Sequence, residues 1–310
     1  MSHIVIVGSL NMDLVVRVPH MPEPGETVLG VDFQQIPGGK GANQAVGAAR
    51  MGAKVTMIGR IGSDDFGREL TKNLSREGID IFNVTVDENE PSGIAIITVD
   101  KQGQNSIVVA SGANMALTPE DIREAWQSIK NIDLVVMPLE IPLDCIEEAV
   151  RLAVQDNVKV VLNPAPAQKI TNELLEKIDV LVPNENETTL LTGMSIESIA
   201  EAETAAKKLL EKGSKAVVLT LGSRGALLVR NELPAEKITP FEVKVVDTTA
   251  AGDAFVAALS VGISDQLSLE NAVYQANAAG ALAVTRMGAQ PSMPTRGEVQ
   301  ELLENQGGNK

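Results

Sequence analysis

The chain alternates between short apolar runs and segments of helical length over most of its 310 residues. The runs are rich in Val, Ile and Leu and cover residues 4–7, 55–58, 134–137, 158–162, 180–182 and 217–221. Segments with apolar residues at helical spacing lie between them, at residues 42–51, 66–76, 119–129, 143–155 and 202–210. Parallel strands need crossover connections of this length, and the helices then cover both faces of the sheet. The sequence therefore predicts an α/β fold with a doubly wound, mostly parallel sheet flanked by helices.

Two stretches, residues 14–37 and 93–111, interrupt this alternation. Each contains strand-like runs that no crossover helix follows, and residues 100–103, Asp-Lys-Gln-Gly, have the composition of a hairpin turn. We expect the two stretches to form one small β-sheet that protrudes from the main domain as a lid. An edge hairpin of the main sheet is the alternative. Because the chain has no repeat and no low-complexity linker, we expect a single domain over residues 1–310.

The composition excludes several classes of protein. The net charge of −15 repels a nucleic-acid backbone, and only 2% of the residues are aromatic and able to stack on bases. A single cysteine, Cys145, and two histidines leave no material for a disulfide within the chain or an ordinary zinc site. There is no run of about 18 apolar residues and no secretory signal at the start. We therefore expect no nucleic-acid partner, no membrane partner and a cytoplasmic location.

The segment over residues 245–255 carries the strongest chemical signal. A strand ends here, the small residues Ala250, Ala251 and Gly252 follow, and an apolar helix begins. Backbone N–H groups at a helix start can surround an anion when no large side chain obstructs them. Asp253, in the first turn, could accept a proton from an attacking hydroxyl beside those amides. A purely structural role, in which Asp253 caps its helix, fits the local spacing equally well.

Two further segments place polar residues near strand ends. In the Gly-Gly segment at residues 37–43, the glycines permit close approach of a ligand, and Lys40 and Asn43 add donors; a plain helix-entry turn is the alternative. Asn11 and Asp13 follow the first strand and would point the same way if the segment is extended. Local Asx turns would explain them as well. Ligands of open α/β sheets bind beyond the carboxyl ends of the strands, where these residues lie.

Together these segments resemble the ribokinase-like family of carbohydrate kinases, over residues 4 to about 303. The resemblance rests on two motifs in the right order, the Gly-Gly segment at residues 38–43 and Asp-Thr-Thr-Ala-Ala-Gly-Asp at residues 247–253. It implies an ATP-dependent kinase that phosphorylates the primary hydroxyl of a small sugar, with D-ribose as the leading candidate. It also implies Mg²⁺ and a monovalent cation, usually K⁺, as cofactors.

The resemblance implies roles for individual residues. Asp253 matches the general base, and Ala250, Ala251 and Gly252 match an anion hole for the transferred phosphoryl group. The sugar is expected to contact residues on three loops and the base itself: Asn11, Asp13, Gly39, Lys40, Asn43, Glu140 and Asp253. The nucleotide is expected to contact Asn184, Thr220, Gly222, Ser223, Gly225, Gly252 and Asn277.

The cations and the subunit partner are implied in the same way. Glu187 matches a residue that acts indirectly on Mg²⁺, although Asn184 and Glu187 also have the spacing of a helix cap. Oxygens of six residues match a K⁺ site: Asp247, Thr249, Ala283, Arg286, Gly288 and Ser292. The lid sheet is expected to pair two copies in a homodimer, with Ile94, Ile96, Ile107 and Val109 on a buried face. A lid that packs only on its own protein would have the same apolar pattern.

One position departs from the family, and two alternative functions stay open. The family commonly has Thr after the base, whereas this chain has Ala254, which lacks a hydroxyl. A kinase of the same family could act on deoxyribose, another sugar or a nucleoside, although few aromatic residues exist to sandwich a base. A sugar-binding protein without turnover is the alternative from another class.

Overall fold

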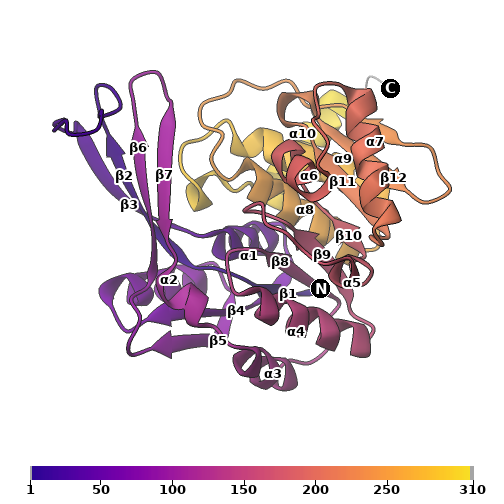
Figure 1. Ribbon diagram of the computed structural model, residues 1–310, viewed down its shortest axis with the longest axis horizontal. Helices are drawn as coiled ribbons and strands as arrows, with labels where there is room; N and C mark the ends of the chain where they lie inside the picture. The colour runs from indigo at the N-terminus through magenta and orange to yellow at the C-terminus, as the bar shows by residue number, and fades with distance from the viewer. Residues whose placement is uncertain (1, 308–310) are drawn as a thin grey trace.

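The computed structural model describes residues 2–307 and contains two β-sheets (Figure 1). The strands of the larger sheet that run parallel to one another are β1 (His3–Val7), β4 (Lys54–Gly62), β5 (Asp80–Asp87), β8 (Leu134–Pro138), β9 (Lys159–Asn163), β10 (Val180–Leu181) and β11 (Ala216–Thr220). β12 (Ala226–Arg230) and β13 (Glu236–Ile238) extend one edge in antiparallel pairing. The order is β13-β12-β11-β10-β9-β8-β1-β4-β5. The predicted mostly parallel sheet is confirmed.

Helices cover both faces of this sheet, as its apolar strands require. On one face lie α1 (Lys40–Arg50), α2 (Asp65–Arg76), α8 (Ala251–Ser264), α9 (Leu269–Ala283) and α10 (Arg296–Gly307). On the other lie α3 (Pro119–Ser128), α4 (Leu143–Gln155), α5 (Asn172–Leu175), α6 (Glu185–Thr192) and α7 (Ile199–Glu211). Ile4 and Ile6 of β1 pack in the first layer, whereas Val5 and Val7 pack in the second. We call this sheet with its helices the body.

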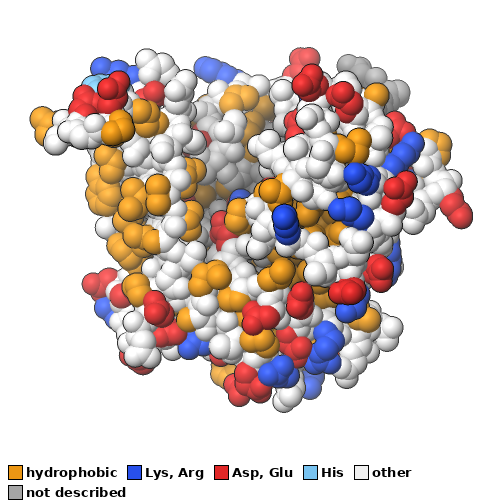
Figure 2. All heavy atoms as spheres, in the orientation of Figure 1, with side chains coloured by type: hydrophobic (Ala, Val, Ile, Leu, Met, Phe, Trp, Pro, Cys, Tyr) orange, Lys and Arg blue, Asp and Glu red, His pale blue; other side chains and the backbone are white. Residues whose placement is uncertain are grey.

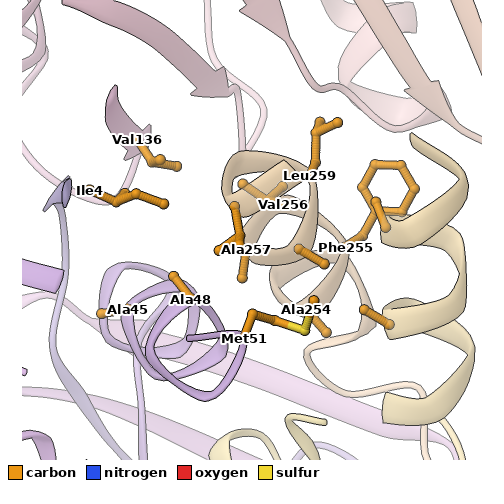
Figure 3. Packing of buried hydrophobic residues seen from close by; sticks show 14 of the residues in the cluster. Ile4, Ala45, Ala48, Met51, Val136, Ala254, Phe255, Val256, Ala257 and Leu259 are labelled. Atoms are coloured by element: carbon orange, nitrogen blue, oxygen red, sulfur yellow. The ribbon is translucent and has the colours of Figure 1, made fainter. Parts of the chain in front are cut away.

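The packing of α1 on α8 positions the candidate site (Figure 3). Met51 at the end of α1 and Ala257 of α8 lie between the two helices, and small residues allow a close approach. A Cβ atom added to Gly47 would lie only 2.7 Å from the Cβ of Ala257. One helical turn earlier on each helix, Asn43 contacts Asp253. The close contact at Gly47 therefore sets the distance between the polar ends of the helices.

The interrupting stretches form a separate four-stranded sheet, which we call the lid sheet. Its strands are β2 (Asn11–Arg17), β3 (Asp32–Gly38), β6 (Gly93–Val99) and β7 (Asn105–Ala110), in the order β3-β2-β6-β7. It projects from the body beside the carboxyl-terminal helices (Figure 1). The N–H of Gly103 donates to the carbonyl of Asp100 at 3.0 Å and closes the predicted hairpin turn. The alternative of an edge hairpin of the main sheet is wrong.

The register of the lid sheet corrects one expectation. Ile96 pairs with Val108, and Ile97 pairs with Ile107. Directly paired residues point to the same face of a sheet, so Ile94 and Ile96 lie on the face opposite to Ile107 and Val109. The four residues therefore do not form one apolar face. Sequence alone could not settle this, because a shift of one residue in the register moves every side chain to the other face.

Three short 3₁₀ turns complete the described chain: Gly112–Ala116, Gly222–Arg224 and Gln290–Ser292. Among residues 2–307, no helix has the length and apolar character needed to cross a bilayer. The single domain over residues 1–310 stays a prediction, and residues 1 and 308–310 lie outside the described residues.

Candidate active site

Asp253 lies in the first turn of α8 and is 5% exposed. Its Oδ2 accepts a hydrogen bond from Asn43 Nδ2 at 2.9 Å, and its Oδ1 accepts one from Gln44 Nε2 at 3.0 Å. The residue at the N-cap is Ala250, and no side chain caps this helix. The interpretation of Asp253 as a helix cap is therefore wrong, because its carboxylate bonds to α1.

The start of α8 exposes backbone dipoles beside this carboxylate. Ala250 has the left-handed φ of 58°, which is strained for a residue with a side chain, and its carbonyl accepts the N–H of Ala254 at 2.9 Å. The N–H of Ala251 makes only a long contact of 3.4 Å with the carbonyl of Thr248. A Cβ atom on Gly252 would meet nothing within 4 Å. The first amides of α8 thus lie against open space, as an anion site requires.

One cavity joins this helix start to the ends of the parallel strands. It is lined by Lys40, Asn184, Glu187, Thr220, Gly252 and Asp253, together with four other residues. Strands β9, β10 and β11 are parallel, so their carboxyl ends meet at one edge of the sheet. The structure therefore brings the candidate base, the anion-hole glycine and two predicted nucleotide residues into one space. A larger cavity of about 560 Å³ lies at the base of the lid sheet, near Gln35, and contains no predicted site residue.

Asn11 and Asp13 point from the lid strand β2 toward the same region. β2 is extended, so residues two apart share a face, and the alternative of Asx turns is wrong. Burial, followed by the negative charges of Glu140 and Asp253, raises the pKa of Asp13 to about 7. Asp13 lies so close to Gly38 that a Cβ there would come within 2.3 Å of its Oδ2.

Lys40 and Glu140 meet at the start of α1. Glu140 Oε2 accepts the backbone N–H of Lys40 at 3.1 Å and the Ser9 hydroxyl at 2.5 Å. The negative charge of Asp253 raises the pKa of Lys40 despite its burial, and Glu140 adds to this effect. Gly39 has a φ of 88°, and a Cβ atom added there would lie 2.6 Å from the backbone nitrogen of Asn11. Glycine therefore permits the start of α1 to touch β2. The predicted sugar residues therefore converge.

Asn184 and Glu187 form a reciprocal capping box at the start of α6. Glu187 Oε2 accepts the N–H of Asn184 at 2.8 Å, and its Oε1 accepts the Asn184 side-chain amide at 2.9 Å. Burial raises the pKa of Glu187, and the hydrogen bonds and Lys40 oppose that effect. The helix-cap interpretation is confirmed, and both Glu187 oxygens are engaged. Within residues 2–307, no group of three or more His, Cys, Asp or Glu residues could hold a metal ion.

The remaining predicted nucleotide residues follow β11 and lie outside the lining of that cavity. Gly222 and Ser223 belong to a 3₁₀ turn. Gly225 has a φ of 88°, and a Cβ atom added there would lie 2.2 Å from the Ile238 carbonyl oxygen. Asn277 Nδ2 donates to the carbonyls of Ile238 and Thr239, both at 3.3 Å. The Asn277 donors are thus used to hold α9 against the end of β13.

The residues predicted for a monovalent cation tie two chain segments together. Asp247 Oδ1 accepts the N–H and hydroxyl of Thr249 at 2.9 and 2.6 Å, and its Oδ2 accepts the N–H of Gly288 at 2.9 Å. Burial raises the pKa of Asp247, but these hydrogen bonds outweigh burial and hold the pKa below its ordinary value. The segment before α8 and the segment after α9 therefore lie side by side.

The other members of this set offer mainly backbone oxygens. The Ala283 carbonyl accepts the N–H of Arg286 at 3.2 Å, and the Ser292 hydroxyl donates to the Ala289 carbonyl at 2.7 Å. The guanidinium of Arg286 pairs with Glu298. Carbonyl and hydroxyl oxygens are hard ligands, so the residues fit a cation of this kind through their backbone.

Sequence analysis missed two amides that orient predicted residues. Gln44, next to Asn43, is fully buried and bonds to Asp253. Asn114 Nδ2 donates to Asn11 Oδ1 at 2.8 Å, and Asn114 Oδ1 accepts the N–H of Leu10 at 2.9 Å. Asn11 therefore presents its amide nitrogen to the site. A polar residue at 44 in the apolar stretch of α1 was the only available signal.

Ala254, which departs from the family pattern, has an apolar environment. Ala254 is 1% exposed and belongs to the apolar cluster between α1 and α8 (Figure 3). A hydroxyl at this position would lie among apolar side chains, where it costs free energy unless a backbone carbonyl accepts it.

Known proteins are similar to this chain in sequence and in overall fold. The family model described as pfkB family carbohydrate kinase matches residues 1–296. The chain belongs to this family. Carbohydrate kinases transfer a phosphoryl group to a sugar hydroxyl, and a buried carboxylate at a helix start that no side chain caps suits that reaction.

Individual relatives cover nearly the whole chain. Ribokinase of Haemophilus influenzae is 43% identical over 300 residues, which cover 97% of this chain and 98% of the relative. Deoxyribokinase of Salmonella typhi is 36% identical over 304 residues, with 97% and 98% covered. The structure of Arabidopsis thaliana ribokinase complexed with ribose and ATP has a TM-score of 0.90 at 35% identity, over 98% of this chain and 99% of that one. The pfkB kinase fold expected from the sequence is confirmed.

Proposed function

We propose that the protein transfers the γ-phosphoryl group of ATP to the primary hydroxyl of D-ribose, giving D-ribose 5-phosphate and ADP. The observation that carries the proposal is the Asp253 carboxylate, which is buried and bonded to α1 at the start of α8, where no side chain caps the helix. The relatives that act as ribokinases, one of them solved with ribose and ATP, support the choice of substrates.

In the proposed reaction, the ribose hydroxyls donate to the carboxylates of Asp13 and Glu140, and Asn11 donates its amide to a ribose oxygen. Gly39, Lys40 and Asn43 complete the sugar site, which presents the 5-hydroxyl to Asp253. The hydroxyl oxygen attacks the γ-phosphorus as the bond to ADP breaks, and the hydroxyl proton passes to Asp253. The amides of Ala250, Ala251 and Gly252 hold the phosphoryl oxygens as negative charge develops on them.

The nucleotide and the cations are assigned to the adjoining loops. ATP would lie over Asn184, Thr220, Gly222, Ser223, Gly225, Gly252 and Asn277. Mg²⁺ neutralises phosphate charge when bound, and Glu187, with both oxygens engaged, would act on it through water. Asp247, Thr249, Ala283, Arg286, Gly288 and Ser292 would hold K⁺ through their oxygens and so order the amides of residues 250–252. A rate that is indifferent to K⁺ at constant ionic strength would reject the K⁺ site.

The lid sheet is proposed to have two roles. Residues 14–37 and 93–111 would close over the sugar and exclude water, which limits wasteful hydrolysis of ATP. The face opposite to Asp13 carries Phe33, Ile96 and Val108, which are 55%, 48% and 63% exposed. Figure 2 shows apolar side chains gathered over the lid. We propose that this outer face pairs two copies of the chain in a homodimer, located in the cytoplasm.

A kinase for deoxyribose is the second candidate, because the Salmonella typhi deoxyribokinase is 36% identical over 97% of this chain. A panel of ribose, deoxyribose, hexoses and nucleosides with ATP, compared by kcat/KM, separates the two. Ribose is expected to have the highest value.

The decisive experiment measures ADP release with ribose, ATP, Mg²⁺ and K⁺ for the wild type and for Asp253→Asn. Loss of a general base is expected to lower kcat by about 10²- to 10⁴-fold, with ribose binding retained in calorimetry. Equal ADP production by the variant, or none by the wild type with any sugar of the panel, contradicts the proposed function.

A further inference from the structure

Gln44 is a fully buried amide at the back of the candidate site. It follows Asn43 on α1, yet it does not line the cavity beside Asp253. Its Nε2 donates to Asp253 Oδ1 at 3.0 Å and to Asn163 Oδ1 at 3.2 Å. Gln44 therefore contacts the carboxylate from the side away from the reactants.

The orientation of the Gln44 amide is determined by a chain of hydrogen bonds that ends on the backbone. Asn163 Nδ2 donates to the carbonyl of Val182 at 2.9 Å, and a carbonyl can only accept. Asn163 must then present its oxygen to Gln44, so Gln44 must present its NH₂ group. The reverse orientation would put the Gln44 oxygen against two acceptor oxygens. One N–H of Gln44 is thus directed at Asp253 whatever the state of the site.

The orientation of the Gln44 amide leaves its oxygen atom without a hydrogen bond. Gln44 Oε1 is buried and has no hydrogen-bond partner in the part of the chain that the structure describes. A buried acceptor without a partner destabilises a fold, and an apolar side chain such as methionine or leucine would carry no such acceptor. The donor end of the side chain must therefore contribute something that packing does not require.

We propose that Gln44 is a positioning residue for Asp253, which it holds together with Asn43 so that the carboxylate faces the sugar hydroxyl. The inference rests on the proposed role of Asp253 as the base. Each carboxylate oxygen accepts one amide N–H and keeps a further lone pair for the incoming proton. Rotation of the carboxylate about its Cβ–Cγ bond would break both amide contacts at once. A hydrogen bond to the ionised form also favours that form over the protonated acid.

The test is Gln44→Met, which keeps the volume and removes the donor. We expect kcat to fall about 10- to 100-fold, as for a small displacement of a reacting group. The KM for ribose should stay within about threefold, because Gln44 lies behind the base. The acid limb of the pH profile of kcat/KM should move to higher pH, because the ionised carboxylate loses a donor. The melting temperature should fall only modestly, because removal of the unpaired Gln44 oxygen partly offsets the donor that Asp253 and Asn163 lose.

A matched control is Gln275→Met. Gln275 Nε2 donates to the carbonyl of Ala258 at 2.9 Å, so it also contacts α8 but lies away from Asp253. Its kcat and pH profile are expected to match the wild type. If Gln44→Met does not fold, Gln44→Glu keeps the shape, and a second carboxyl beside Asp253 should move the acid limb upward as well.

The outcomes separate this inference from the proposed function. Suppose that the wild type turns over, that Asp253→Asn abolishes this turnover, and that folded Gln44 variants keep the kcat and pH profile of the wild type. This result would overturn the positioning role of Gln44 and leave the proposed function intact. Asn163→Ala supplies a further check, because Asn163 acts on Asp253 through Gln44. Its effect should largely vanish in the Gln44→Met background, and full additivity of the two losses would contradict the hydrogen-bond chain.

Discussion

The body and the lid sheet hold their buried carboxyl groups in opposite ways. Asp253 and Asp13 are 5% and 8% exposed. Both oxygens of Asp253 accept hydrogen bonds from amides of α1. The Asp13 carboxyl has no such partner within residues 2–307, and burial with neighbouring negative charge raises its pKa to about 7. The body thus holds the proposed base in place by hydrogen bonds of its own, whereas the lid carboxyl would gain hydrogen-bond donors from the proposed sugar.

This difference follows from the elements that carry the two groups. Asp253 lies on a helix that packs against α1 over several turns, so its neighbours are held by the apolar core. Asp13 lies on β2 of the small lid sheet, which projects from the body (Figure 1). At the far end of β2, the Arg17 guanidinium lies 3.1 Å from Met287 Sδ of the body. Rigid packing suits the proposed base, whose position would determine the rate, and a projecting sheet suits the proposed closure over the sugar.

The largest effect is expected when the body loses its close helix contact. Gly47→Val adds carbon atoms where a Cβ already comes within 2.7 Å of Ala257, so α1 must move away from α8. We expect kcat to fall about 100-fold or more and the free energy of unfolding to fall by about 1–3 kcal/mol. Steady-state kinetics and denaturant unfolding measure the two quantities.

The matched control for this change is Gly297→Val, because a Cβ on Gly297 has no neighbour within 4 Å. It is expected to leave kcat near the wild-type value. A Gly47→Val enzyme with normal kcat would show that the body does not position Asp253 through this contact.

On the lid side, Asp13→Asn is expected to weaken sugar binding rather than the chemical step. Hydrogen bonds to a charged group contribute about 1.5–3 kcal/mol, so the KM for ribose should rise about 10- to 100-fold. The kcat at saturating ribose should change much less, since Asp253 and its amide partners remain in place. A fall in kcat of about 10- to 100-fold with an unchanged KM for ribose would contradict the assignment of Asp13 to sugar binding and of Asp253 to the chemical step.

The raised pKa of Asp13 predicts a dependence of ribose affinity on pH. The ionised carboxylate accepts from sugar hydroxyls, so binding must release a proton wherever the free group is protonated. With a pKa of about 7, ribose affinity should rise between pH 6 and 8, by at most about tenfold per unit below the pKa. Calorimetry in buffers of different ionisation enthalpy measures the released proton, and Asp13→Asn should abolish it.

The raised pKa of Asp13 has the opposite effect on the stability of the ligand-free protein, which should decrease with pH where ribose affinity increases. The folded state holds this proton more tightly than the unfolded chain, because the pKa is raised on folding. The contribution of Asp13 to the free energy of unfolding should therefore decrease as the pH rises from about 4 to 7. A stability curve that is identical in the wild type and in Asp13→Asn over this range would contradict the assignment.

The smallest effect on catalysis is expected on the outer face of the lid. Ile96→Glu places a charge on the exposed apolar face and should shift a dimer toward monomer in sedimentation experiments, with kcat changed less than about threefold. Phe82→Glu is the control, because Phe82 is 83% exposed on β5 of the body. A wild type that is monomeric at all concentrations would reject the lid-mediated dimer.

Much of the body was predictable because its signals are local. The apolar runs predicted β1, β4, β8, β9, β10 and β11 to within a few residues, and the helix over Leu143–Gln155 was predicted with its observed bounds. Strand β5 was missed because its Phe82 and Val86 are exposed and alternate with polar residues. β12 and β13 were missed because they pair antiparallel at the edge, outside the βαβ rhythm.

The sequence by itself determined the layered α/β body, the presence of the lid strands and the helix start that carries Asp253, because periodicity and small residues act over a few positions. Only the tertiary structure decided which partners these residues have. Gln44 and Asp253 are 209 residues apart, and Asn114 and Asn11 are 103 apart. The strand register of the lid and the contact at Gly47 were likewise decided by the packing of segments that are far apart in the sequence. Such pairings depend on how separate elements pack, and no local pattern encodes the distance between them.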